Sequence, residues 1–326
     1  MLTAKDLRGV YAIMPTPARA DAARPDAVDT VDLEETARLA DQMIVDGVDG
    51  LIALGTTGEC ATLTSKEYRA VVDCLLTTVR GRVPIFIGTT TLGTHETVDR
   101  AKFARAQKAD GTLLGLPMWQ PFPPEAAARS YALMSETLPD FPIMVYANTN
   151  AFRNDFGVEF WRHVAATAPT VMSAKFLNAE ILAECVAVTH GRINFLPNDG
   201  RALAFHKAAP DALTACWSTT ASMGPQPVIA LMQAILAGDI ARAEAVAADL
   251  QHCSAAVRSI TRNDELFAQV NIQMEKLRFE AAGYCKPGPI RPPYDWMPDD
   301  LAEMARECGR RWAALCKEKY SASLTG

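Results

Sequence analysis

Eight short apolar runs, spread over the first two thirds of the chain, most constrain its fold. Most are apolar throughout rather than alternating, as parallel strands covered on both faces require. They cover residues 9–15, 48–54, 83–89, 110–117, 142–148, 170–176, 192–197 and 212–218. Successive runs mostly begin about 20 to 35 residues apart, which is the spacing of strand–helix units.

Amphipathic stretches separate these runs. Residues 32–46 place their apolar side chains on one helical stripe, and Thr64 to Glu67 form a capping box at the start of another helix. Five further segments each hold a helix of about two to four turns: 94–108, 124–137, 157–168, 178–190 and 199–209. The alternation predicts an α/β chain with a closed (β/α)8 TIM barrel. An open doubly wound sheet is the alternative, disfavoured because no GxGxxG or GxxxxGK follows any run.

The chain becomes helical after residue 224. Four helical segments are expected, at 226–237, 239–257, 264–282 and 299–318. The first would close the barrel, and the last three resemble an added helical layer. We therefore expect a catalytic barrel over residues 1–238 and a C-terminal helical extension, packed on the barrel, over residues 239–326.

Composition excludes several function classes. The chain has 326 residues and a net charge of −6, so no basic face for nucleic acid is expected. No apolar run approaches the length of a membrane span, and the N-terminal segment lacks the apolar stretch of a secretory signal. The eight cysteines form no CxxC pair and are expected to be reduced thiols packed as small hydrophobic groups. These features predict a cytoplasmic protein.

Metal and serine-hydrolase chemistry find little support. The five histidines show neither HxH nor HExxH spacing, and no GxSxG motif is present. No metal site is therefore predicted.

The sixth run contains a lysine, Lys175, inside an otherwise apolar strand. A charge buried there is costly, and desolvation would lower the pKa of the amine. A free amine in a dry pocket is a nucleophile toward ketones. The alternative is that the lysine reaches the rim of the barrel or pairs with a carboxylate.

Two other groups follow strand ends, where the active sites of such barrels lie. The fifth run carries Tyr146 near its end, and the second is followed by Gly55-Thr56-Thr57-Gly58-Glu59. The loop offers two hydroxyls and backbone N–H groups that suit a carboxylate or a phosphate, although it could also be a simple turn. Tyr146 could likewise be a core tyrosine. Together with Lys175 these groups suit Schiff-base chemistry on a 2-keto acid.

With these residues in place, the chain resembles the dihydrodipicolinate synthase/N-acetylneuraminate lyase superfamily. Its members are class I pyruvate aldolases on a (β/α)8 barrel with a C-terminal helical extension. Within it, the chain is most similar to the hydratase-aldolases of aromatic-hydrocarbon breakdown, which act on ortho-substituted benzylidenepyruvates. The similar stretches are AIMPTP (12–17), GTTGECATLT (55–64), MVYANTNAF (144–152), WSTTASMGP (217–225), NIQMEKLRFEAAG (271–283) and GPIRPPYD (288–295).

The resemblance implies roles for particular residues. Lys175 would form the Schiff base, Tyr146 would transfer protons, and the loop of Gly55, Thr56 and Thr57 would bind the pyruvyl carboxylate. A second set, Asn148, Trp217 and Asn271, would line the aromatic and water-handling side. The resemblance also implies a homotetramer, no cofactor, and a small 2-keto acid and an aromatic aldehyde as partners.

The loop after the fourth run offers walls for an aryl group. Trp119 and Phe122 are candidates, and Phe152 is a further one, although ordinary loop packing would also explain all three. Glu59 is expected to be structural, bonded to the backbone of its own loop.

One departure from the lysine-biosynthesis branch puts dihydrodipicolinate synthesis in doubt. There an arginine stands five residues after the tyrosine, whereas here that position is Ala151 and the nearest arginine is Arg153. Arg153 favours an ortho carboxylate, which would give 2-carboxybenzaldehyde, over an ortho hydroxyl, which would give salicylaldehyde. The alternatives are another pyruvate-dependent enzyme, such as a sugar-acid aldolase or a dihydrodipicolinate synthase-like enzyme, and a non-catalytic keto-acid-binding barrel.

Overall fold

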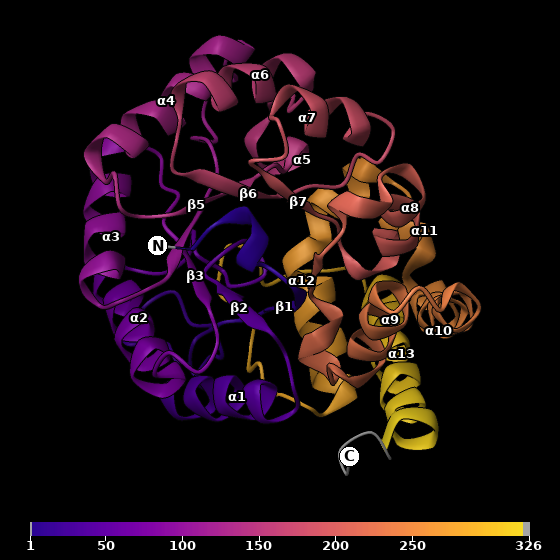
Figure 1. Cartoon of the computed structure of the whole chain (residues 1–326). Coiled ribbons are helices and arrows are strands. Elements are labelled where there is room, and N and C mark those ends of the chain that lie inside the picture. Colours follow the sequence, from indigo (N-terminus) through magenta and orange to yellow (C-terminus); the bar gives the residue numbers. More distant parts are fainter. Residues whose placement is uncertain (1, 322–326) are drawn as a thin grey trace. The chain divides into compact units, whose positions relative to one another are not determined.

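Eight strands alternate with helices along the chain, and they make the (β/α)8 barrel that the sequence predicts (Figure 1). The structure is a computed structural model that describes residues 2–321. It divides into two compact units. The first contains the residues up to Gly9 and Pro84–Trp217, and the second contains Val10–Val83 and the residues from Ser218 onward.

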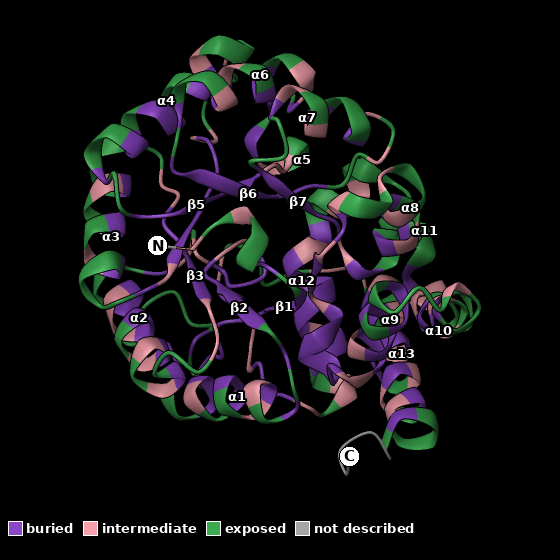
Figure 2. Cartoon of the chain, viewed as in Figure 1, coloured by how far each residue is buried: buried purple, intermediate pink, exposed green. Residues whose placement is uncertain are grey.

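Each predicted apolar run contains one strand. The strands are β1 Gly9–Ile13, β2 Gly50–Ala53, β3 Ile85–Gly88, β4 Gly111–Leu114, β5 Ile143–Tyr146, β6 Val171–Lys175, β7 Asn194–Leu196 and β8 Ala215–Ser218. Nearly every strand residue is buried, and the strands are purple in Figure 2. Burial on both faces explains why these runs are apolar throughout instead of alternating.

The first unit holds strands β3 to β7, which pair in parallel in that order. Tyr146 on β5 is the register partner of Lys175 on β6, and Lys175 is in turn the partner of Leu196 on β7. Its helices are α3 Thr94–Ala106, α4 Pro124–Thr137, α5 Thr149–Phe152, α6 Val158–Thr167, α7 Leu182–Val188 and α8 Ala202–Ala208.

An aromatic cluster forms the core beside β6. Trp161 on α6 contacts Phe176 and Phe195 edge to face, with ring centroids 5.6 and 4.8 Å apart. Phe176 directly follows Lys175, so this packing fixes the end of the strand that bears the lysine.

The second unit contains the parallel pair β1 and β2. Glycine is required at Gly50, because a Cβ there would lie 2.2 Å from the ring of Tyr11. Its helices are α1 Leu33–Val45, α2 Ser65–Val79, α9 Gln226–Leu236, α10 Ile240–Ser254, α11 Arg258–Thr261, α12 Asp264–Ala282 and α13 Asp299–Leu315. The predicted capping box is confirmed at the start of α2, where the Thr64 hydroxyl accepts from Glu67 N and Glu67 accepts from Thr64 N.

The four helical segments expected after residue 224 are confirmed as α9, α10, α12 and α13. The C-terminal helices share a small core that includes Val257, Ile260, Val270, Met274 and Cys308. The boundary between residues 238 and 239 stays a prediction, and residues 322–326 of the predicted extension lie outside the described part. Among residues 2–321, no helix is long and apolar enough to span a membrane.

All eight cysteines fall within the described residues and are free thiols, five of them buried. Burial raises the pKa of Cys185 and Cys316 to about 12, so these thiols are poor nucleophiles. In the described part of the chain, no three His, Cys, Asp or Glu side chains are grouped as metal ligands.

Candidate active site

The side chain of Lys175 lies between two aromatic rings. Its Nζ atom is 3.8 Å from the centroid of the Trp217 ring and 4.4 Å from the centroid of the Tyr146 ring. Only 7% of Lys175 is exposed. Both aromatic faces attract the ammonium through cation–π interactions, which hold the Lys175 side chain in place.

Strand register explains why these groups meet. Tyr146 and Lys175 are partners on neighbouring strands, so their side chains leave the same face of the sheet. Trp217 forms a parallel β-bridge with Asn198, which follows β7. The backbone N–H of Trp217 donates to Pro197 O at 2.9 Å. The structure thus places three predicted residues, Lys175, Tyr146 and Trp217, together within the first unit.

Asn148 contacts the hydroxyl of Tyr146. Its amide Nδ2 donates to the Tyr146 hydroxyl oxygen at 3.2 Å, and its Oδ1 accepts from Ala151 N at 2.9 Å. The second bond caps helix α5, so the amide is held in one orientation. One residue therefore combines a structural role at the helix start with a contact to the proposed proton-transfer group.

Phe152 lies behind Tyr146. The two rings meet edge to face with centroids 5.2 Å apart, and Phe152 is 1% exposed. Its ring also fills the space beside Gly115, where a Cβ would lie 2.1 Å away. Phe152 supports the tyrosine from within the core in this structure.

Trp119 lies in the loop after β4 and is 77% exposed. The loop is tied down through its backbone, because Arg153 Nη1 donates to Trp119 O at 3.3 Å and Phe122 N donates to Asn154 Oδ1 at 2.7 Å. Asn154 was not singled out from the sequence, and an asparagine in a loop carries no signal that would have identified it. The loops after β4 and β5 are therefore linked, with the indole projecting outward.

Three buried polar atoms on β6, just after β7 and on β8 have no hydrogen-bond partner within the described residues. They are Ser173 Oγ, Asn198 Oδ1 and Trp217 Nε1. Ser173 precedes Lys175 by two positions on β6, so both side chains lie on the same face of the strand.

The threonine loop, residues 55–59, belongs to the second unit. The loop turns back on itself, as Glu59 N donates to Thr56 O at 2.9 Å and Cys60 N to Gly55 O at 3.3 Å. Thr57 is buried and Thr56 half-buried. Gly58 must be glycine, since a Cβ would lie 2.8 Å from Leu54 N.

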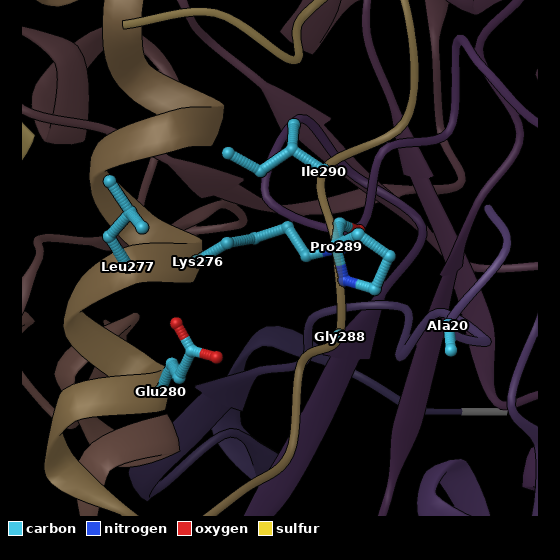
Figure 3. Close-up of a pocket in the computed structure, with 7 residues that line it drawn as sticks. All are labelled: Ala20, Lys276, Leu277, Glu280, Gly288, Pro289 and Ile290. Carbon is cyan, nitrogen blue, oxygen red and sulfur yellow. The ribbon is translucent and has the colours of Figure 1, made fainter. Parts of the chain in front are cut away.

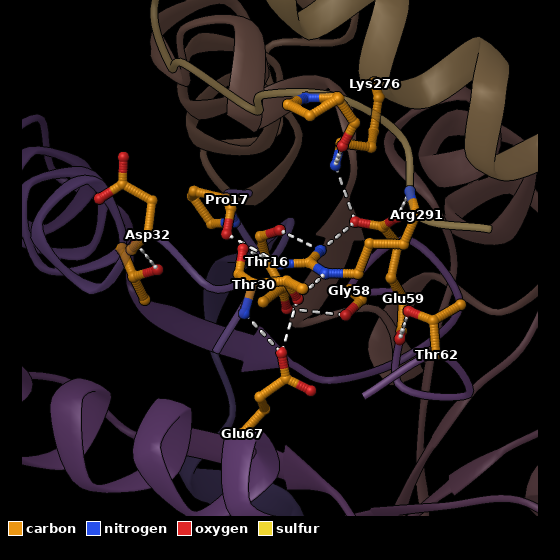
Figure 4. Close-up of polar contacts among 12 residues, drawn as sticks. Thr16, Pro17, Thr30, Asp32, Gly58, Glu59, Thr62, Glu67, Lys276 and Arg291 are labelled. Atoms are coloured by element: carbon orange, nitrogen blue, oxygen red, sulfur yellow. Dashed lines mark hydrogen bonds and ion pairs between the residues drawn. The ribbon is translucent and has the colours of Figure 1, made fainter. Parts of the chain in front are cut away.

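The structure corrects the expectation for Glu59. Its carboxylate is bonded to the C-terminal part of the chain and not to its own loop. It accepts from Lys276 Nζ at 2.8 Å, Arg291 Nη1 at 2.7 Å and Arg291 N at 3.0 Å (Figure 4). Local sequence does not mark Lys276 or Arg291 as partners of Glu59, because they lie 217 and 232 residues further along the chain.

Asn271 also belongs to the second unit. It follows a break in α12 at Val270, whose φ of −124° and ψ of 15° are not helical, and it is half-buried. The candidate site residues are thus divided between the two units. The second unit holds Gly55, Thr56, Thr57 and Asn271, and the first holds Trp119, Tyr146, Asn148, Phe152, Lys175 and Trp217.

The chain is similar to known proteins over nearly its whole length. A trans-O-hydroxybenzylidenepyruvate hydratase-aldolase of Pseudomonas aeruginosa is 39% identical over 99% of this chain and 97% of its own length. A trans-2'-carboxybenzalpyruvate hydratase-aldolase of a Nocardioides strain is 36% identical over 99% of this chain and 98% of its own. The solved structure of PhdJ bound to a substrate intermediate superimposes with a TM-score of 0.93 at 34% identity. The superposition covers 98% of this chain and 99% of the PhdJ chain.

A family model matches most of the chain as well. Residues 10–304 match the model described as the dihydrodipicolinate synthetase family. The chain therefore belongs to the dihydrodipicolinate synthetase family.

Proposed function

We propose that this chain is a class I hydratase-aldolase that cleaves an ortho-substituted benzylidenepyruvate to an aromatic aldehyde and pyruvate. The observation that carries the proposal is the buried amine of Lys175, held between the rings of Tyr146 and Trp217. Support also comes from the full-length similarity to enzymes named as hydratase-aldolases, which are lyases.

The reaction begins at the ketone. The neutral amine of Lys175 attacks C2 of the keto acid, and loss of water gives a protonated imine. This iminium is conjugated to the side-chain double bond, so it withdraws electrons from C4. The imine acts as the electron sink, and the proposed reaction uses no metal or organic cofactor.

Hydration follows at C4. A water molecule attacks C4 while a proton is delivered to C3, giving a β-hydroxy iminium. The Tyr146 hydroxyl and the Asn148 amide, 3.2 Å apart, form a polar pair suited to orient this water. We assign Asn271 and the indole N–H of Trp217 to the same polar side of the site.

Retro-aldol cleavage completes the carbon chemistry. Tyr146 takes the C4 hydroxyl proton and passes its own phenolic proton to solvent, the C3–C4 bond breaks, and the aromatic aldehyde leaves. The bonding electrons pass to the imine nitrogen and leave an enamine on Lys175. Protonation of its carbon and hydrolysis of the imine then release pyruvate and the free lysine.

We assign the substrate carboxylate to Gly55, Thr56 and Thr57. These residues follow β2, and Lys175 ends β6; in (β/α)8 barrels catalytic groups come from the C-terminal ends of several strands. Hydroxyls and backbone N–H groups of a tight loop are suitable donors to a carboxylate. The aryl group is assigned to the side of Trp119, with Phe152 supporting Tyr146 from behind.

For the ortho substituent we favour a carboxylate. The guanidinium of Arg153 lies on the loop that follows Tyr146 and Asn148, and it is the charge complement that an aryl carboxylate needs. An ortho hydroxyl is the second candidate. We further propose a cytoplasmic homotetramer that acts in the degradation of polycyclic aromatic hydrocarbons, and size-exclusion chromatography with light scattering tests the tetramer.

Borohydride trapping tests the proposed function. The wild-type protein is incubated with pyruvate and sodium borohydride, and its intact mass is measured. We expect a stable adduct that peptide mapping places on Lys175 and that is absent from Lys175→Ala. Absence of an adduct on the folded wild type would overturn the class I assignment.

A further inference from the structure

We propose that Lys276 and Arg291 are positioning residues that act through Glu59 to hold the threonine loop in its carboxylate-binding conformation. The inference rests on the proposed function, in which that loop binds the carboxylate of the keto acid. It gives the C-terminal part of the chain an indirect part in substrate affinity, through Glu59.

The three charged side chains are almost fully buried. Their side-chain exposures are 0% for Glu59, 1% for Lys276 and 3% for Arg291. Both cations bond to the same oxygen, Oε2, at 2.8 and 2.7 Å (Figure 4). A buried carboxylate that loses one of these partners is left undercompensated and must move or take up a proton.

Arg291 is bonded at every guanidinium N–H. Nε donates to Thr30 Oγ1, Nη1 to Thr16 O and to Glu59, and Nη2 to Pro17 O and Thr30 O. The guanidinium therefore locks the segments around residues 16 and 30 to the threonine loop. Thr16 adds a second tie to the same loop, since its hydroxyl donates to Gly58 O at 2.7 Å.

The backbone explains why the loop depends on this anchor. Glu59, the last residue of the loop, has a φ of 50°, and Leu54, immediately before the loop, has a φ of 60°. Such left-handed conformations are unfavourable for residues other than glycine and persist where surrounding contacts hold them. Glu59 N also donates to Thr56 O, so a shift of Glu59 is transmitted directly to one of the two proposed carboxylate-binding threonines.

Lys276 also lines a cavity in the same unit. The cavity has a volume of about 450 Å³, and it is bordered by helix α12 and the segment 288–290 (Figure 3). Its lining residues are Ala20, Lys276, Leu277, Glu280, Gly288, Pro289 and Ile290. A small cation could reach the place of the Lys276 ammonium from this cavity once the side chain is truncated.

Lys276→Met tests the inference, because methionine keeps the apolar stem and removes the charge. We expect two quantities to rise about 10- to 100-fold: the KM for the benzylidenepyruvate, and the pyruvate concentration at which borohydride trapping is half-saturated. This is the loss of affinity expected when a hydrogen bond to a charged group is displaced. At saturating substrate, kcat per trappable Lys175 should change less than about threefold. A role confined to stability would instead lower the trappable fraction and leave KM unchanged.

Chemical rescue provides a second readout. In Lys276→Ala, ethylammonium chloride should restore part of the lost affinity, whereas equal concentrations of sodium chloride should not. Lys66→Ala is the matched control, because it breaks an exposed ion pair with Asp29 in the same unit and should leave KM unchanged. If Lys276→Met fails to fold, Glu59→Gln is measured in the same way, since it keeps the side-chain shape and removes the charge.

The outcomes separate this inference from the proposed function. A wild type that traps no pyruvate overturns the proposed function and this inference with it. A wild type that is trapped on Lys175, together with unchanged KM in both Lys276→Met and Glu59→Gln, overturns this inference alone. A wild-type KM in the folded Lys276→Ala variant without ethylammonium would also overturn it.

Discussion

Tyr146 and Lys175 are register partners on adjacent parallel strands, and the lysine nitrogen lies 4.4 Å from the centroid of the tyrosine ring. The pairing places a phenol next to an amine without any contribution from a flexible loop. If Tyr146 is the acid–base group that we propose, its place on a strand keeps it at a fixed distance from the reacting atoms.

Tyr146→Phe should separate imine formation from turnover. The variant keeps the ring that packs against Lys175 and Phe152 and loses only the hydroxyl. We expect borohydride trapping of pyruvate on Lys175 to persist while kcat falls by about 10²- to 10⁴-fold, the usual contribution of a general acid–base group. Steady-state kinetics and intact mass check this, and wild-type turnover would remove Tyr146 from the mechanism.

Asn148 offers a matched pair of variants. Asn148→Asp keeps an oxygen to accept from Ala151 N but loses the N–H that donates to Tyr146, whereas Asn148→Ala loses both. We expect both variants to lose turnover, and only the alanine variant to lose the helix cap, at a cost of about 1 kcal/mol in the free energy of unfolding. Urea denaturation and kcat are the measurements. Equal stabilities, or full activity in Asn148→Asp, would contradict the assignment.

Arg153 should decide preference between the two ortho substituents. The test compares Arg153→Leu with the wild type. Each is assayed with trans-2'-carboxybenzylidenepyruvate and with trans-o-hydroxybenzylidenepyruvate. We expect kcat/KM for the carboxy substrate to fall about 10-fold or more, the loss of one charge-assisted hydrogen bond, with little change for the hydroxy substrate. Equal losses for both substrates would show that Arg153 acts only by holding the Trp119 loop through its bond to Trp119 O.

Glu67 should make the stability of the fold sensitive to acid. Burial raises the pKa of its carboxyl, but hydrogen bonds from Thr30 and Thr64 outweigh burial and hold the pKa below its ordinary value. A folded-state pKa below the unfolded value stabilises the protein above about pH 4.5, and this stabilisation is lost as the pH falls through the folded value.

The measurement for Glu67 is the free energy of unfolding in urea at several pH values. Glu67→Gln should be less stable than the wild type at pH 7, by about 1–3 kcal/mol, and the gap should narrow below about pH 4.5. Glu34→Gln, which removes an exposed carboxylate on α1, is the matched control. A gap that stays constant from pH 7 to pH 3 would contradict the prediction.

Local sequence was sufficient to locate the helices and strands and to single out Lys175 as a candidate reacting group. The eight apolar runs and the capping box at Thr64 and Glu67 arise from interactions within a few residues, so each could be located from its own segment. Lys175 could be singled out from its own segment as well, because a charged residue in an apolar strand is costly to bury wherever that strand packs.

Tertiary structure alone decided how those groups are held. The cation–π contact between Lys175 and Trp217 depends on contacts between strands. The burial of Phe152 behind Tyr146 depends on the space that Gly115 leaves. The partners of Glu59 lie more than 200 residues further along the chain, at Lys276 and Arg291. Hydrogen bonds and ion pairs depend on the separation of atoms in space, and sequence position does not report that separation.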